Sequence, residues 1–147
     1  MNKLAIVRKT GKEGLRIHGK RGHPEVRDCF VRFAKWLRKE REFPIRINVY
    51  LSPYSYIFAR DGDKCIGTIW VPDDPNCFPY IRIATGDYEK RKVEDGRDIA
   101  LTSDLCNLCH ELIHYWQWLN TNKMWEKGVT RQAITLVKLY AETTNHP

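Results

Sequence analysis

The 147-residue sequence lacks any apolar run that approaches the eighteen or so residues of a membrane span, which argues against a membrane partner. Its N-terminus, MNKLAIVRKT, lacks the apolar core and small-residue cleavage site of a secretory signal peptide. Cysteine is scarce, at five residues, and the odd number argues against a disulfide framework. No repeat, low-complexity tract or composition shift marks a domain boundary. We therefore expect one cytoplasmic domain over residues 1–147.

The charge is unevenly distributed along the chain. The net charge is +7, and residues 1–42 carry 13 Lys/Arg against 5 Asp/Glu, whereas the remainder carries 12 against 13. A basic N-terminal third can attract nucleic acid or an acidic partner. Since no nucleic-acid-binding motif accompanies these residues, the sequence favours solvated faces over nucleic-acid binding through residues 1–42.

Hydrophobic periodicity predicts an α+β domain. Residues 1–23 read as an extended or hairpin segment, and Pro24 then opens a helix that ends before Pro44. Three strands are expected, in a small mixed or antiparallel sheet of three to five strands, followed by a charged loop and two helices. The predicted strands are residues 45–51, 65–71 and 80–84, the loop is 87–98, and the helices are 102–120 and 124–142.

The stretch His110-Glu111-Leu112-Ile113-His114 carries the main chemical signal. On a helix, a spacing of four places both imidazoles on one face, where they can reach one metal ion. Glu111 lies about 100° further around the helix, so it can accept a proton beside the metal without joining the ligands. An apolar stripe should occupy the opposite face, with Gln117 on the ligand face. Its members are Leu105, Leu108, Leu112, Tyr115 and Leu119.

A catalytic zinc site generally has three protein ligands and an open position. Glu126 is the best third ligand, because a short turn at residues 121–123 would fold the next helix back and place Glu126 in its first turn. It shares a register with the apolar residues of that helix, and an inward carboxylate needs a partner. The alternatives are Glu142, near the chain end, and His18 or His23.

With Glu126 on the following helix, the motif resembles a small gluzincin-type zincin metallopeptidase, similar to minimal gluzincins and to ImmA/IrrE-like or SprT-like intracellular peptidases. The resemblance implies a zincin-like fold and one Zn²⁺ held by His110, His114 and Glu126. It also implies that Glu111 acts as general base and acid in peptide-bond hydrolysis, with a peptide or protein as substrate. The strand before the motif helix would bind the substrate as a sheet edge, and Tyr140 is the candidate for oxyanion stabilisation. That strand comprises Tyr80, Ile81, Arg82, Ile83 and Ala84.

The sequence offers three alternatives to a metallopeptidase. Cys106-Asn107-Leu108-Cys109-His110 also fits the CxxCH pattern of c-type haem attachment, with Met124 as a distal ligand. The second is a structural Cys/His zinc site using Cys106 and Cys109, which the spacing disfavours because Cys106 and His114 stand about 12 Å apart along the helix and cannot share one ion. The third alternative is a zincin-like module without catalysis that serves in binding or regulation, with nucleic acid as a possible partner.

Overall fold

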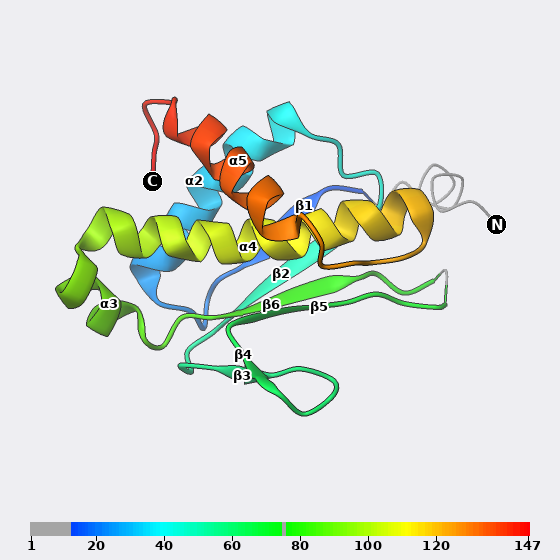
Figure 1. Ribbon diagram of the computed structural model, residues 1–147, viewed down its shortest axis with the longest axis horizontal. Coiled ribbons are helices and arrows are strands. Elements are labelled where there is room, and N and C mark those ends of the chain that lie inside the picture. The colour runs from blue at the N-terminus through cyan, green and yellow to red at the C-terminus, as the bar shows by residue number, and fades with distance from the viewer. Residues whose placement is uncertain (1–12, 75) are drawn as a thin grey trace.

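The structure is a computed structural model that describes residues 13–74 and 76–147, and it has an α+β fold (Figure 1). The described residues form four helices, a four-stranded mixed sheet and a two-stranded sheet. In chain order the elements are β1 (Leu15–His18), α2 (Pro24–Glu40), β2 (Ile47–Ser52), β3 (Ile57–Phe58), β4 (Lys64–Cys65), β5 (Gly67–Trp70), β6 (Tyr80–Ala84), α3 (Tyr88–Asp95), α4 (Arg97–Thr121) and α5 (Val129–Ala141).

The main sheet has the order β1-β2-β6-β5, in which β1, β2 and β6 are parallel and β5 runs antiparallel at the edge. Side chains alternate between two faces, so every second residue of β2 and β6 is buried. The predicted small mixed sheet is confirmed, and β6 has the predicted bounds. The predicted strand over residues 65–71 is instead divided into β4 and β5 at Ile66. The predicted segment 1–23 is extended at β1, and its first twelve residues lie outside the described part of the chain.

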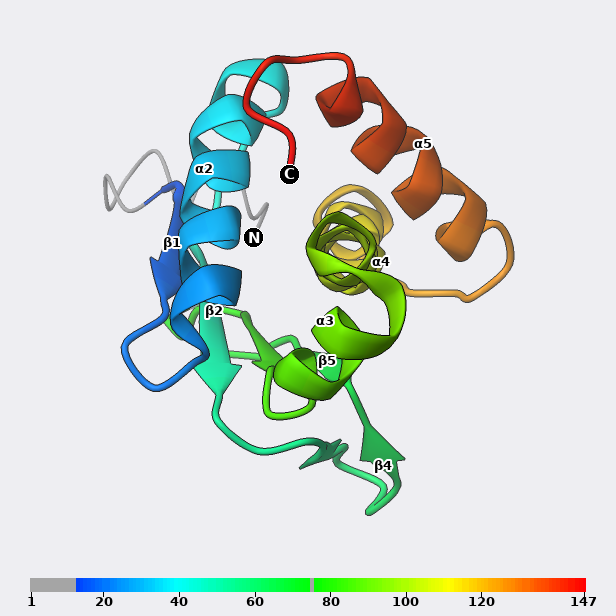
Figure 2. The ribbon, with the colours of Figure 1, turned by 90° about the vertical axis from the view of Figure 1, so that its left-hand side faces the viewer.

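The helices pack on one side of this sheet, as Figure 2 shows in a view along α4. The predicted stripe of α2, from Val26 to Leu37, is fully buried, and α4 buries Leu105, Leu108 and Leu112. The Tyr115 hydroxyl of α4 donates to the Ile45 carbonyl, which ties α4 to the segment before β2. The apolar back of α4 is therefore fixed in the core, as predicted. None of the described helices is long and apolar enough to cross a membrane.

The prediction of a loop over residues 87–98 is wrong, because this segment forms α3 and the start of α4. Its charges have partners from elsewhere in the chain. Arg91 donates to Asp104 at 2.7 Å, and Lys92 contacts Glu25 at 2.6 Å. Tyr88 is buried and donates its hydroxyl to Glu25. These contacts stabilise a charged helix that would be solvated in isolation.

The last helix begins later than predicted. Asn122 ends α4 in the left-handed conformation, and α5 starts only at Val129, after Gly128 at φ 82°. Residues 122–128 therefore form a non-helical connection, which we call the strap. The predicted apolar register of α5 is nevertheless correct, since Val129, Ala133, Leu136 and Tyr140 are buried.

Candidate metal centre

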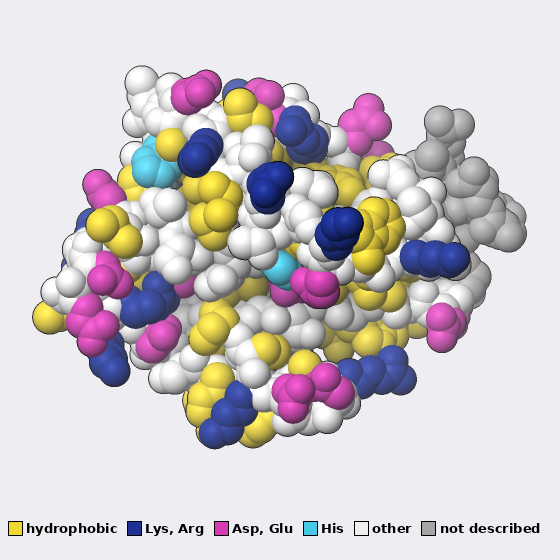
Figure 3. All heavy atoms as spheres, in the orientation of Figure 1, with side chains coloured by type: hydrophobic (Ala, Val, Ile, Leu, Met, Phe, Trp, Pro, Cys, Tyr) yellow, Lys and Arg dark blue, Asp and Glu magenta, His cyan; other side chains and the backbone are white. Residues whose placement is uncertain are grey.

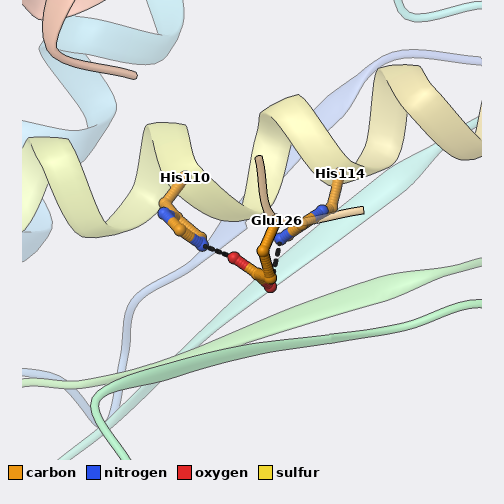
Figure 4. Close-up of side chains that lie close together, drawn as sticks. All are labelled: His110, His114 and Glu126. Carbon is orange, nitrogen blue, oxygen red and sulfur yellow. Dashed lines mark hydrogen bonds and ion pairs between the residues drawn. The ribbon is translucent and has the colours of Figure 1, made fainter. Parts of the chain in front are cut away.

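Two imidazoles project from the face of α4 opposite its apolar stripe, as the spacing predicts. His110 and His114 have ring centroids 5.1 Å apart, and their planes meet at 73°. Both side chains point away from the apolar back of the helix and towards the strands (Figure 4). His110 is half-buried, whereas His114 is 5 % exposed. Because α4 is anchored along its opposite face, the two rings are presented on a rigid support.

Glu126 contacts both imidazoles from the strap. The prediction that it lies in the first turn of a helix is therefore wrong, because α5 begins only at Val129. Its Oε2 lies 3.1 Å from Nε2 of His110, and its Oε1 lies 3.0 Å from Nε2 of His114. The ligand atoms of the three residues all lie within 4.8 Å of one another. The left-handed Asn122 turns the chain back along α4, and this reversal brings the carboxylate to the imidazoles.

Gln117 determines which nitrogen of His114 can bind a cation. The backbone N–H of Trp125, in the strap, donates to Oε1 of Gln117 at 3.0 Å, so this atom is the amide oxygen. Nδ1 of His114 lies 2.9 Å from the same oxygen and must therefore donate to it. In a neutral ring, Nε2 of His114 then carries the lone pair. Gln117 thus orients a ligand nitrogen and holds the strap with one atom.

Nε2 of His114 faces a carboxylate oxygen of Glu126, whereas His110 can donate its own Nε2–H to the same carboxylate. An unprotonated imidazole nitrogen and a carboxylate oxygen at 3.0 Å repel unless a proton or a metal ion lies between them. Two nitrogen ligands and one carboxylate suit Zn²⁺, whose tetrahedral ligands stand roughly 3.3 Å apart. The two N–O distances are close to this spacing, although they involve different oxygens of Glu126, and one ligand atom from each residue lies within 4.8 Å of the others. The exposed side chain of Glu126 leaves room for the adjustment that the widest gap requires.

Glu111 lies beside the cluster and outside it. Its side chain is buried between α4 and β5, and it is 8 % exposed. A Cβ atom at Gly67 of β5 would stand 2.9 Å from Cδ1 of Ile83, which is too close, and 3.6 Å from Oε1 of Glu111, which is an ordinary contact. The glycine therefore fits the close packing on Ile83, with the carboxyl group of Glu111 next to it. Burial raises the pKa of Glu111 to about 7, His114 lowers it and Glu126 raises it. A carboxyl group with such a pKa can accept and release a proton near neutral pH.

The centre is open to solvent. In the space-filling view of Figure 3, a histidine side chain and acidic side chains meet at the surface near the middle of the face. The side chain of Glu126 is 76 % exposed, whereas the side chain of His114 is 6 % exposed. Solvent therefore reaches the cluster from the side of the strap, while α4 covers the imidazoles from behind.

The strand predicted to bind substrate is not an edge strand. β6, from Tyr80 to Ala84, pairs with β2 on one side and with β5 on the other, so it has no free edge. The free edge next to α4 belongs to β5. This strand precedes β6 in the chain and pairs with it antiparallel. Gly67 places this edge strand directly against Glu111.

Tyr140 does not reach the centre. Its ring packs against Phe33 and Trp36 of α2, and its hydroxyl donates to the Asn145 carbonyl at 2.8 Å. The predicted role in oxyanion stabilisation is therefore wrong, because the residue belongs to the core between α2 and α5.

The alternative ligands are engaged elsewhere or lie apart from the cluster. His18 pairs with Asn48, and His23 accepts from the Glu25 backbone N–H at the start of α2. The described residues yield one group with metal-ligand geometry, and neither these histidines nor Glu142 belongs to it.

The two cysteines of the CxxCH pattern differ in exposure. Cys109 is fully buried in the core, where burial raises the pKa of its thiol, while Cys106 is half-buried. A thioether to Cys109 would require the core to open, so the structure does not favour haem attachment.

Comparison with protein-family models, with curated proteins and with solved structures finds no match to this chain. A functional assignment therefore depends on the geometry of the site.

Two features of the site were missed by sequence reasoning. Gln117 was placed on the correct helix face without a role, and Gly67 carried no signal because its closeness to Glu111 depends on the sheet order.

Proposed function

We propose that this chain is a zinc-dependent peptidase with a zincin-like arrangement of helix α4 and edge strand β5. The observation that carries the proposal is the convergence of His110, His114 and Glu126, with the buried carboxyl group of Glu111 on the same helix beside Gly67. Three ligands leave one position of a tetrahedral ion open for chemistry.

Different residues would hold the ion, transfer a proton and align the substrate. His110, His114 and Glu126 would hold the ion, and Gln117 would orient His114. Zinc, when bound, supplies a Lewis acid that polarises a carbonyl group and lowers the pKa of water. Glu111 would take the proton of the attacking water and pass it to the leaving amine. The free edge of β5 offers backbone groups that can pair with an extended peptide across the site.

The test combines metal content with turnover. We expect one zinc per chain by mass spectrometry of the native protein, and chelation should abolish hydrolysis of a casein or peptide-library substrate. The variant Glu111→Gln should retain zinc and lose turnover, while the control Glu142→Gln should retain both. Full hydrolysis by Glu111→Gln would refute the role of Glu111. Bound zinc with no hydrolysis by the native protein would support a silent binding module instead.

A further inference from the structure

The second face of the main sheet is left open by the helices, which lie on the other side (Figure 2). The side chains on this face are half-buried or exposed, in contrast to the buried residues between them. The strand register aligns them in two rows that cross all four strands. The rows are Arg16, Asn48, Tyr80 and Trp70, and His18, Tyr50, Arg82 and Thr68.

Aromatic rings connect the strands across this face. His18 stacks on Tyr50 with a centroid separation of 4.6 Å and an interplanar angle of 17°. Tyr50 meets Tyr80 edge-on at 6.1 Å, and Tyr80 stacks on Trp70 at 5.3 Å. The result is a continuous ladder of rings. Cross-strand aromatic pairs of this kind also stabilise a sheet, so the ladder alone does not indicate a ligand.

A hollow of about 1200 Å³ continues the open face towards the β3–β4 hairpin. Two aromatic side chains that have no cross-strand partner in the main sheet, Tyr54 and Phe58, line it with exposures of 65 % and 54 %. Sheet stability does not account for such exposure, because neither residue belongs to the ladder. The hollow therefore adds solvent-facing rings beyond those that the sheet requires.

The charge of the hollow has one sign. Lys20, Arg21 and Arg82 line it, and the described lining residues include no Asp or Glu. Arg82 donates to the Phe58 carbonyl at 2.7 Å, and its Nε is buried without a hydrogen-bond partner among the described residues. On the adjoining β3–β4 hairpin, Lys64 lies over the ring of Tyr56 at 4.4 Å. The exposed Asp61 and Asp63 balance Arg60 and Lys64, so the net positive charge belongs to the hollow itself.

We propose that the open sheet face and this hollow bind single-stranded nucleic acid. Its phosphates complement the Lys and Arg side chains, and its bases can stack on exposed rings without sequence preference. A duplex keeps its base faces stacked internally and gains nothing from Tyr54 or Phe58. Arg16, Lys20 and Arg21 belong to the basic N-terminal third, for which the sequence alone favoured solvated faces.

The binding test compares fluorescein-labelled dT20, rU20 and a 20-base-pair duplex by fluorescence anisotropy on the full chain at 50 and 200 mM salt. We expect tighter binding of the single strands and weaker binding at higher salt. The double variant Tyr54→Ala/Phe58→Ala should weaken dT20 binding at least about fivefold. Its matched control replaces Ile99, an apolar side chain on α4 that is 64 % exposed, with Ala and should change nothing.

A second pair of variants separates a specific surface from general attraction. Lys20→Ala/Arg21→Ala should remove about two phosphate contacts. The slope of log binding constant against log salt concentration should therefore become shallower by about two. Arg131→Ala/Lys138→Ala removes the same charge from exposed positions on α5 and should have little effect. Glu111→Gln should bind like the native chain, so this result is independent of the proposed peptidase activity.

Several outcomes would overturn the proposal. They are no binding at 50 mM salt, equal binding of duplex and single strand, or an equal loss in the two charge-matched variants. Light scattering on the same proteins tests a second copy of the chain as the occupant. A dimer that dissociates in Tyr54→Ala/Phe58→Ala, with no oligonucleotide binding, would assign the face to self-association.

Discussion

Replacing Gln117 with Leu should weaken zinc binding without removing a ligand. The native Oε1 accepts from His114 at 2.9 Å and from the Trp125 backbone at 3.0 Å. Leu has a similar volume and accepts neither bond, so His114 loses the partner that keeps the lone pair on Nε2. The strap that carries Glu126 also loses one of its attachments. Loss of such an orienting partner lowers metal affinity by about 10- to 100-fold, or about 1.4 to 2.7 kcal/mol.

The conservative variant Gln117→Glu separates orientation from packing. A carboxylate oxygen can accept both bonds, and the Nε2 group that it replaces is buried without a partner among the described residues. We therefore expect its zinc affinity to stay within about threefold of the native value. Gln132→Leu, at an exposed position on α5, serves as the control for the change in side-chain type.

The assay is competition for zinc against a chromophoric chelator of known affinity. Urea denaturation of the metal-free proteins shows whether each variant is folded. Unchanged affinity in Gln117→Leu would refute the role of the hydrogen bonds, and so would an equal loss in Gln117→Glu.

Two further predictions concern the surroundings of the site. Gly67→Val places a side chain against Ile83 and beside Glu111, so the packing around Glu111 must shift and turnover should fall at least tenfold while zinc content, measured by mass spectrometry, stays constant; native turnover would contradict the proposed use of this space. Burial raises the pKa of Asp104 from 3.8 to about 6. Protonation of Asp104 therefore contributes to the free energy of unfolding, and this contribution is complete below pH 3.8 and is lost as pH rises through 6. An Asn side chain cannot titrate, so the free energy of unfolding of Asp104→Asn minus that of the native chain should rise by about 2 to 3 kcal/mol from pH 4 to pH 6.5, as measured by urea denaturation. Parallel pH profiles of the two proteins would contradict this assignment.

Local periodicity determined what the sequence could predict. The face shared by His110 and His114, the buried stripe of α2 and the bounds of β6 all follow from side-chain spacing within one element. Glu126 was grouped with the two imidazoles on the assumption of a helix, and the structure brings it there on the strap. Its role as a ligand remains a prediction.

Long-range contacts determined what the sequence could not predict. The segment with Arg91 and Lys92 is helical because it pairs with Asp104 and Glu25, which lie elsewhere in the chain. The free edge falls on β5 because strand order is a property of the whole sheet. No pattern within residues 80–84 distinguishes an interior strand from an edge strand.

The strap makes the three proposed ligands unequal in how firmly they are held. His110 and His114 belong to a helix of 25 residues, whereas Glu126 stands between two residues with left-handed backbone, Asn122 and Gly128. The carboxylate can swing away without breaking a helix or exposing the core. Opening of the strap would therefore remove Glu126 from the cluster while His110 and His114 stayed in place. We expect the rate of zinc exchange to follow opening of the strap, independently of the rate at which the domain unfolds.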